Sequence, residues 1–393
     1  MRILDVKRDW SWNKRALDSI AHGALTNSKR PASFVSGVYP THLERGRGPF
    51  VWDTAGNRYM DFICGLGTSV LGHSPEEVTG RVMLALHDGV SLSLGSTYEV
   101  LAAEKLKEVV PFVESVRFLK TGSEACTAAL RIARTYTGRA NVMSESYHGW
   151  HDEFVSMTPP ANGIEADFPI FPMDLTAIDS SFAAVIIEPI NLEYSSKRIE
   201  WLKELREKCT KHGVVLIFDE IITGFRTPDF TVSKHIGVTP DLLCLGKAMA
   251  SGFPLSAVAG SKDLMESDYF VSSTFAGERI SLAAFLATAI SLQNKYNLQH
   301  LWADGNRYRE SFNKLHSGLR LEGYGTRAAL VGDPMTKALF MQEACLSGQL
   351  YGSSWFIGFP HLQYLETSLS AVFSILTRIE TDQVSLLGQM PKS

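Results

Sequence analysis

One lysine at the end of an apolar run is the first candidate for chemistry in this chain of 393 residues. Lys247 closes the run Asp-Leu-Leu-Cys-Leu-Gly-Lys, and small residues follow it. The pattern predicts an amine at the point where a buried strand opens into a tight turn, against a cavity. Desolvation disfavours the ammonium form, so such a lysine can act as a nucleophile and bind an aldehyde as a Schiff base. The alternative is a solvated surface lysine.

A carboxylate closes a second apolar run, Val-Val-Leu-Ile-Phe-Asp, at Asp219. A carboxylate at the end of a buried strand is costly to leave unpaired. Asp219 therefore needs a cation, and a protonated pyridine nitrogen is one candidate. The alternative is an aspartate that caps the next loop or helix.

Two glycine- or hydroxyl-rich segments are candidates for binding phosphate. Gly122 and Ser123 stand between a predicted strand and a predicted helix, where free N–H groups and the helix dipole attract anions. A capping box of Thr121 with Glu124 explains the same residues, and the two roles can coexist. Thr274, in a Ser-Ser-Thr cluster, is a second possible phosphate ligand, or an ordinary N-cap.

Tyr147 follows a third predicted strand, in the segment Tyr-His-Gly-Trp-His. Ligands of open α/β sheets bind at the carboxyl ends of strands, where an aromatic ring can stack on a planar ligand. The alternative is a core tyrosine. His148 and His151 invite a metal interpretation, but no further residues with ligand spacing support it, so no metal site is predicted.

The elements that must position these residues alternate along the chain. Strands are predicted at 116–119, 141–144, 183–188, 214–219, 242–245 and 257–260, with helices such as 124–136 and 198–211 between them. The second of these helices is expected to end at Gly213. This alternation predicts an α/β domain with a mostly parallel sheet flanked by helices. We expect a large domain over 60–304 and a small α+β domain from 1–59 and 305–393, with a β-hairpin around 53–57.

Composition excludes several classes of function. The net charge of −4 argues against a nucleic-acid binder, and no apolar run is long enough for a transmembrane helix. The first residues do not resemble a signal peptide, and neither a dinucleotide-binding Gly-x-Gly-x-x-Gly after a strand nor a P-loop is present. We expect a cytoplasmic protein whose widely spaced cysteines are buried and reduced: Cys64, Cys126, Cys209, Cys244 and Cys345.

In order and spacing, several segments resemble the class III aminotransferases of the pyridoxal-phosphate fold type I superfamily, in the branch nearest glutamate-1-semialdehyde 2,1-aminomutase. They are GPFVWDTAGNRYMDF, VRFLKTGSEACTAALRIARTYTGR, SYHGWHDEF, VIIEP, VVLIFDEIITGFR and GVTPDLLCLGKAMASGFPLSAVAG. The resemblance implies that Lys247 holds pyridoxal 5′-phosphate as an internal aldimine and then moves protons on the substrate carbon. It makes Asp219 the partner of the pyridine nitrogen, which keeps the ring electron-withdrawing.

The resemblance also assigns the binding residues. Gly122 and Ser123 hold the phosphate, and Tyr147 stacks on the ring. Thr274 reaches the phosphate of the neighbouring subunit, which implies a homodimer with shared active sites. Arg30 grips the substrate carboxylate, a task that suits a bidentate guanidinium, although a surface arginine is the alternative.

Three departures from the family pattern concern the substrate side. The segment after Phe154, through 159–164, is shorter than the lid of the aminomutase, and the sequences after Pro189 and Thr274 are unusual. We therefore expect an aminotransferase that moves an amino group from a small-molecule amine donor to a keto or aldehyde acceptor. An intramolecular aminomutase reaction is the alternative, and a cofactor-binding scaffold without turnover is a third hypothesis.

Overall fold

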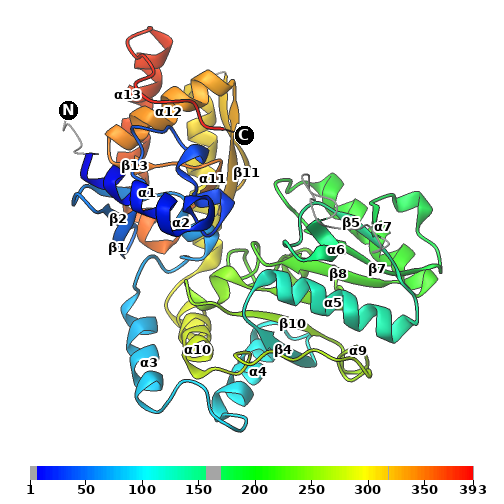
Figure 1. Ribbon diagram of the computed structural model, residues 1–393. Helices are drawn as coiled ribbons and strands as arrows, with labels where there is room; N and C mark the ends of the chain where they lie inside the picture. The colour runs from blue at the N-terminus through cyan, green and yellow to red at the C-terminus, as the bar shows by residue number, and fades with distance from the viewer. Residues whose placement is uncertain (1–6, 156–169, 317, 393) are drawn as a thin grey trace. The chain divides into compact units, whose positions relative to one another are not determined.

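The computed structural model describes residues 7–155, 170–316 and 318–392 (Figure 1). They form two compact units, each described separately below. The first unit contains the described residues up to Pro75 and from His300 onward, and the second is Glu76–Gln299. The divisions thus fall at residues 75 and 299, where the sequence predicted 59 and 304. The first of them lies later because residues 60–62 are bonded to the C-terminal part of the first unit: Met60 and Asp61 pair with Gln349 and Leu350, and the Phe356 N–H donates to the Phe62 carbonyl oxygen at 2.8 Å. Helix α3 (Glu76–His87), which packs on α10 (Arg279–Asn294), begins the second unit.

The first unit joins the beginning and the end of the chain. Its sheets have the orders β1-β2-β3-β13 and β11-β12-β14. The strands are β1 (Leu43–Arg47), β2 (Phe50–Asp53), β3 (Arg58–Asp61), β11 (Leu319–Tyr324), β12 (Arg327–Gly332), β13 (Gln349–Leu350) and β14 (Ser354–Phe356). The helices are α1 (Lys7–Ser19), α2 (Cys64–Gly67), α11 (Leu298–Leu315), α12 (Pro334–Leu346) and α13 (Leu365–Glu380), with the short turns η1 (Ala21–Gly23), η2 (Asn27–Lys29), η3 (Pro31–Ser33) and η6 (Phe359–Tyr364).

The predicted hairpin is confirmed as the antiparallel pair β2 and β3. Buried Asp53 organises its turn, because Oδ1 accepts from the backbone N–H groups of Ala55 at 3.0 Å and Asn57 at 2.8 Å. Oδ2 accepts from the Tyr59 hydroxyl at 2.9 Å. The aspartate therefore ties the turn to the strand that follows it.

The second unit is built on a seven-stranded sheet of order β4-β10-β9-β8-β7-β5-β6. Its strands are β4 (Ser115–Leu119), β5 (Asn141–Glu145), β6 (Ile170–Pro172), β7 (Phe182–Ile187), β8 (Val215–Glu220), β9 (Leu242–Leu245) and β10 (Ser256–Gly260). All neighbours pair in parallel except β10, which is antiparallel to β4 and β9. The predicted mostly parallel sheet is confirmed, and the predicted strands match to within one residue at each end.

Helices surround this sheet. Besides α3 and α10 they are α4 (Thr97–Val109), α5 (Gly122–Thr137), α6 (Asp152–Val155), α7 (Ser196–His212), α8 (Val232–Ile236) and α9 (Lys262–Met265), with the turns η4 (Leu175–Ala177) and η5 (Lys247–Ala250). Gly213 ends α7 in the left-handed conformation with φ of 61°, as the sequence predicted. α10 is buried along most of its length, which explains its apolar composition on all sides.

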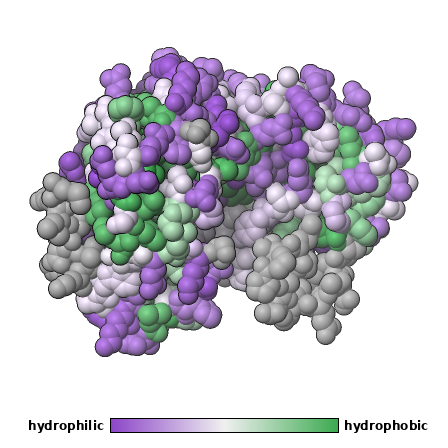
Figure 2. Space-filling view, turned by 90° about the horizontal axis from the view of Figure 1, so that it is seen from above, coloured by the Kyte–Doolittle hydropathy of each residue, from purple (hydrophilic) through white to green (hydrophobic). Residues whose placement is uncertain are grey.

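The surface seen in Figure 2 is largely hydrophilic, with separate apolar areas. No helix within the described ranges is long and apolar enough to cross a bilayer. All five cysteines lie within those ranges, are buried and form no disulfide, as predicted.

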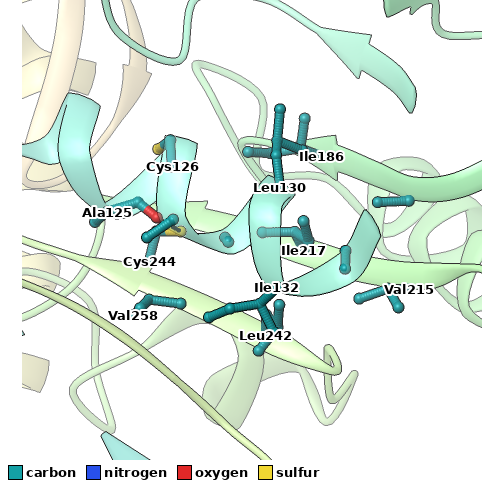
Figure 3. Packing of buried hydrophobic residues seen from close by; sticks show 14 of the residues in the cluster. Ala125, Cys126, Leu130, Ile132, Ile186, Val215, Ile217, Leu242, Cys244 and Val258 are labelled. Atoms are coloured by element: carbon teal, nitrogen blue, oxygen red, sulfur yellow. Dashed lines mark hydrogen bonds between the residues drawn. The ribbon is translucent and has the colours of Figure 1, made fainter. Parts of the chain in front are cut away.

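The core of the second unit lies between α5 and the sheet (Figure 3). Small residues on one face of α5, Ala125 and Ala129 among them, let the helix approach the strands closely. Leu130 and Ile132 then pack on strand residues such as Ile217. Strands β7 to β10 are buried along their whole length, which is why their sequences are continuous apolar runs rather than alternating ones. This packing fixes the edge of the sheet where the candidate residues gather.

Candidate active site

Asp219 lies near the carboxyl end of β8 and is only 5% exposed. Its Oδ1 accepts the backbone N–H of Ile221 at 3.0 Å. Its Oδ2 accepts from His148 Nδ1 at 2.7 Å and from the Cys126 thiol at 3.5 Å. The neighbouring Cys244 thiol, burial and the charge of Asp219 raise the pKa of the Cys126 thiol, so Cys126 stays protonated and donates.

The Asp219 carboxyl is ionised despite its burial. Burial is the largest influence on its pKa and acts to raise it. The hydrogen bond and charge of His148, the Ile221 N–H and the charge of Lys247 outweigh that effect, and the pKa is lowered below its usual value. The site therefore offers a fixed negative charge in a poorly solvated place, which suits a cationic ligand atom.

His148 is a functional residue that sequence reasoning missed, because it was weighed only as a metal ligand. The ring is 2% exposed, with Nε2 at 2.8 Å from the Glu145 carbonyl oxygen and Nδ1 facing Asp219. A neutral imidazole has one donor nitrogen and one acceptor nitrogen. Only the doubly protonated ring donates to both partners, so the geometry favours a buried ion pair between His148 and Asp219. A polar ring directly after β5, at the same edge as Asp219, was the available signal.

Lys247 follows β9, the parallel neighbour of β8, and opens η5. The pairing of Asp219 with Cys244 brings the ends of the two strands to one edge of the sheet. The charge of Lys247 contributes to the lowered pKa of Asp219, so the two side chains act on each other. Lys247 has a φ of 44°, a left-handed conformation that costs a non-glycine residue about 1 kcal/mol. Such strain is typical of functional positions.

Gly122 and Ser123 form the first turn of α5, whose N–H groups have no partner within the helix. A Cβ at Gly122 would lie 2.9 Å from Cγ2 of Ile221, and one at Gly246 would lie 3.1 Å from Cδ1 of the same side chain. The Ile221 side chain therefore packs against both Gly122 and Gly246, and leaves no room for a side chain at either position. Ser123 Oγ accepts the backbone N–H of Trp150 at 3.3 Å, which brings the loop after β5 onto the start of α5.

The capping box at the start of α5 is also present. Thr121 Oγ1 accepts the N–H of Glu124 at 3.2 Å, and the Glu124 carboxylate accepts the N–H of Thr121 at 2.7 Å. The cap holds the turn that precedes the helix through Thr121 and Glu124 and does not use the N–H groups of Gly122 and Ser123. The two roles weighed from the sequence are therefore compatible at this position.

Tyr147 is 56% exposed and so is not a core residue. Its pKa is raised, mainly by burial of part of the ring and also by the charge of Asp219. The tyrosine thus lies near Asp219 with part of its ring accessible to a ligand. Gly149, two residues later, has a φ of 119°, and a Cβ there would lie 2.5 Å from Ser123 Oγ.

Two further predicted residues, Thr274 and Arg30, belong to other segments of the chain. Thr274 is exposed in the loop before α10 and is not the N-cap of that helix, since the Glu278 carboxylate accepts the N–H groups of Ile280 at 2.7 Å and Ser281 at 3.0 Å. Arg30 belongs to the first unit, where it lines a cavity. The segment 159–164, expected to form a short lid, lies outside the described residues.

Glu220, next to Asp219, is fully buried and has a structural role that the sequence did not reveal. Its carboxylate accepts the backbone N–H groups of Val232 at 2.7 Å and Ser233 at 2.9 Å, and the Thr223 hydroxyl at 3.2 Å. Burial is the main cause that raises its pKa to about 7. Glu220 thus ties the start of α8 to the end of β8, next to Asp219.

The clustered groups fit a small ring that carries a cation, an aldehyde and a phosphate. The ionised Asp219 matches the cation, the Lys247 amine matches the aldehyde, and the Gly122–Ser123 turn provides N–H groups in a space that a Cβ would fill. Tyr147 leaves part of a ring face accessible. These are the groups that pyridoxal 5′-phosphate requires, and they come from four separate strand ends.

The chain is similar to several known proteins. The profile of the family "Aminotransferase class-III" matches residues 34–182 and 172–319. The chain is 32% identical over 326 residues to a glutamate-1-semialdehyde 2,1-aminomutase of Syntrophobacter fumaroxidans, covering 75% of each chain. It is also 32% identical over 310 residues to a 3-aminobutyryl-CoA aminotransferase of Cloacimonas acidaminovorans, again with 75% of each covered. The fold matches that of the FumI protein of Sphingopyxis sp. MTA144 in its PLP internal aldimine form, with a TM-score of 0.90, 23% identity and coverage of 98% and 99%.

Proposed function

The chain belongs to the class-III aminotransferase family, and we propose that it uses pyridoxal 5′-phosphate to move an amino group from a small amine donor to a keto or aldehyde acceptor. The observation that carries the proposal is the position of a buried, ionised Asp219 and of Lys247 at the ends of two neighbouring parallel strands, close enough for the charge of Lys247 to lower the pKa of Asp219. When bound, the cofactor supplies a protonated ring that accepts electron density from the substrate carbon.

Lys247 and Asp219 divide the chemistry between them. Lys247 would hold the aldehyde group of the cofactor through its amine, and the same amine would move a proton to and from the substrate carbon. The carboxylate of Asp219 would hold the ring nitrogen in its protonated form. His148 keeps that carboxylate ionised and oriented through its 2.7 Å hydrogen bond.

The loop residues bind and orient the cofactor. The N–H groups of Gly122 and Ser123 would bind the phosphate at the positive end of α5, and Tyr147, whose ring is partly exposed, would stack on the cofactor ring. Gly149 lets the Tyr147 loop approach Ser123, where any side chain would collide. Arg30 binds an anionic group of the substrate, as the resemblance implies.

The direct test is spectroscopic. We expect purified protein with added pyridoxal phosphate to absorb visible light, and an amine donor to bleach that band as the amino group is taken up. Lys247→Ala removes the covalent attachment and should lose both the band and the activity. A wild-type protein that stays colourless with added cofactor would contradict the proposal.

The proposed enzyme is a homodimer with shared sites, in which Thr274 reaches the phosphate bound by the partner subunit. Exposed apolar side chains in one stretch of the second unit support an interface: Met83, Leu84, Leu86, Val90, Leu92 and Leu94. Such a concentration of apolar surface is typical of protein–protein contacts. The cytoplasmic location expected from the sequence stays a prediction.

Hybrid dimers test the sharing. A hybrid of a Lys247→Ala subunit with a Thr274→Ala subunit has one site with both changes and one site with neither, if Thr274 acts across the interface. Co-expression of the two chains with different tags should therefore restore activity that neither variant has alone. Isolated hybrids no more active than the Thr274→Ala homodimer would refute the shared site.

The aminomutase reaction is the second candidate, because one relative is named for it. The two reactions differ in whether the product of the first half-reaction leaves. An α-amino aldehyde such as glutamate 1-semialdehyde, supplied without any other amine donor, distinguishes them. We expect one stoichiometric half-reaction that stalls; sustained turnover would identify an aminomutase.

A further inference from the structure

We propose that the first unit contains a binding pocket for an organic phosphate. A cavity of about 780 Å³ is lined entirely by residues of this unit. Cavities of about 300–1,000 Å³ are typical of sites for small organic ligands. The lining combines charged, hydroxyl and apolar side chains, so its chemistry identifies the class of ligand.

The charges in this pocket have one sign. Arg30, Lys337 and Lys392 line it, and none of its described lining residues is acidic. The chain as a whole has a net charge of −4, so a basic cavity does not follow from its composition. Asp333, which caps α12 next to Lys337, partly balances that lysine but does not line the cavity. Three cations around one cavity repel one another, and a bound anion relieves that repulsion.

Arg30 provides a second, independent indication. Its Nε is buried and has no hydrogen-bond partner in the described part of the chain. A buried donor without a partner is costly, and the guanidinium fork matches the oxygens of phosphate and carboxylate groups. A small movement of the Arg30 side chain toward the cavity would let a ligand oxygen accept this N–H.

The pocket is constructed from segments far apart in the sequence. Arg30 follows η2, and Lys337 lies on α12. The C-terminal segment is held beside them, because the backbone N–H of Lys392 donates to the carbonyl oxygen of Ala32 at 2.7 Å. Ser36 and Gln389 pair through two further backbone hydrogen bonds, of 2.8 and 3.2 Å. The fold therefore fixes the backbone that carries the three cations.

The number of cations favours phosphate over a single carboxylate. Arg30 alone balances one carboxylate, whereas three cations match the two or three negative charges of a phosphate ester or diphosphate. Phe34, Leu66 and Met341 line other parts of the cavity and suit the organic portion of the ligand. Because the proposed function assigns Arg30 to the substrate, the substrate is then an organic phosphate. That last step rests on the proposed function, whereas phosphate binding by the pocket does not.

Calorimetric titration of the cofactor-loaded protein with inorganic pyrophosphate tests the pocket. We expect saturable binding that weakens as salt is added. The double variant Lys337→Met/Lys392→Met should weaken it about tenfold or more, as expected for the loss of charge-assisted hydrogen bonds. Lys314→Met, an exposed lysine of α11 that does not line the cavity, is the matched control and should bind like the wild type.

Three results would overturn the proposal. They are no saturable binding to the wild type, equal affinity in the double variant and the control, and glutarate binding as tightly as pyrophosphate, which would make this a carboxylate pocket. The visible band of the bound cofactor is recorded on the same samples. A normal band without pyrophosphate binding refutes only the pocket, whereas a colourless protein that binds pyrophosphate refutes only the amino-transfer proposal.

Discussion

Replacement of His148 by phenylalanine tests the electrostatic design of the site. In the wild type, burial acts to raise the pKa of Asp219, and His148 provides the strongest opposing effect. The phenyl ring keeps the aromatic contact with Phe154 but cannot donate to Asp219. The pKa of Asp219 should therefore rise, because burial still raises it while the hydrogen bond and charge of His148, which lower it most, are removed.

The magnitude follows from the lost interaction. A hydrogen bond to a charged group contributes about 1.5–3 kcal/mol, so the ionised carboxylate loses about that much stabilisation. If protonation of the cofactor's ring nitrogen depends on the negative charge of Asp219, the rate of proton removal from the substrate falls about 10- to 100-fold. The loss should deepen as the pH falls, because protonation of Asp219 begins at a higher pH than in the wild type.

The assay is the single-turnover half-reaction with an amine donor, followed by the cofactor's visible absorbance across a range of pH. His151→Phe is the matched control, since His151 lies in the same loop but bonds Thr127 Oγ1 at 3.0 Å rather than Asp219. Circular dichroism verifies that both variants are folded. If the His148→Phe enzyme had the same single-turnover rate as the control, and the same fall in rate at low pH, the assigned role of His148 would be refuted.

Three further predictions concern the same edge of the sheet. Asp219→Asn should retain bound cofactor but slow proton removal by several orders of magnitude in single-turnover assays, and near-normal turnover would exclude its role. Gly149→Ala should lower cofactor affinity and thermal stability more than Gly138→Ala does. Both glycines have positive φ, but only a Cβ at position 149 would collide with Ser123. Fluorescence titration measures the affinity and thermal melting the stability, and equal losses in the two variants would contradict the close approach of Gly149 to Ser123. Glu220→Gln should remove a pH dependence of unfolding: with a folded pKa of about 7 against an ordinary 4.5, the wild type loses roughly 3 kcal/mol of stability as the pH rises from about 4.5 to 7. Urea unfolding at several pH values measures this difference, and parallel curves for the two proteins would refute it.

Several elements of the fold were predictable because their sequences carry local signals. Continuous apolar runs predicted the buried strands β7 to β9, and Gly213 predicted the end of α7. The Asp-Thr-Ala-Gly-Asn turn predicted the β2–β3 hairpin, because Asp53 can bond its own turn. Each of these features depends on residues close together in the chain.

Other features depended on residues far apart and escaped local reasoning. The N-cap of α10 is Glu278 rather than Thr274, and its carboxylate also pairs with Lys120 at 2.6 Å. Lys120 is distant in sequence, so no local pattern near α10 indicated that choice. In the same way, the boundary lies at residue 75 rather than 59 because residues 60–62 are bonded to strands near the C-terminus, and that distant pairing is not visible in the local composition.

The amino-acid sequence by itself determined the chemical types at the site: an amine and a carboxylate at the ends of apolar runs, small residues at a helix start, and an aromatic after a strand. Tertiary structure decided that Asp219 and Lys247 influence each other, because parallel pairing of β8 with β9 brings their ends to one edge. It also decided that Asp219 is ionised, because that depends on the balance between burial and the long-range contact with His148. Burial and partners are properties of the packed chain, and no sequence window contains them.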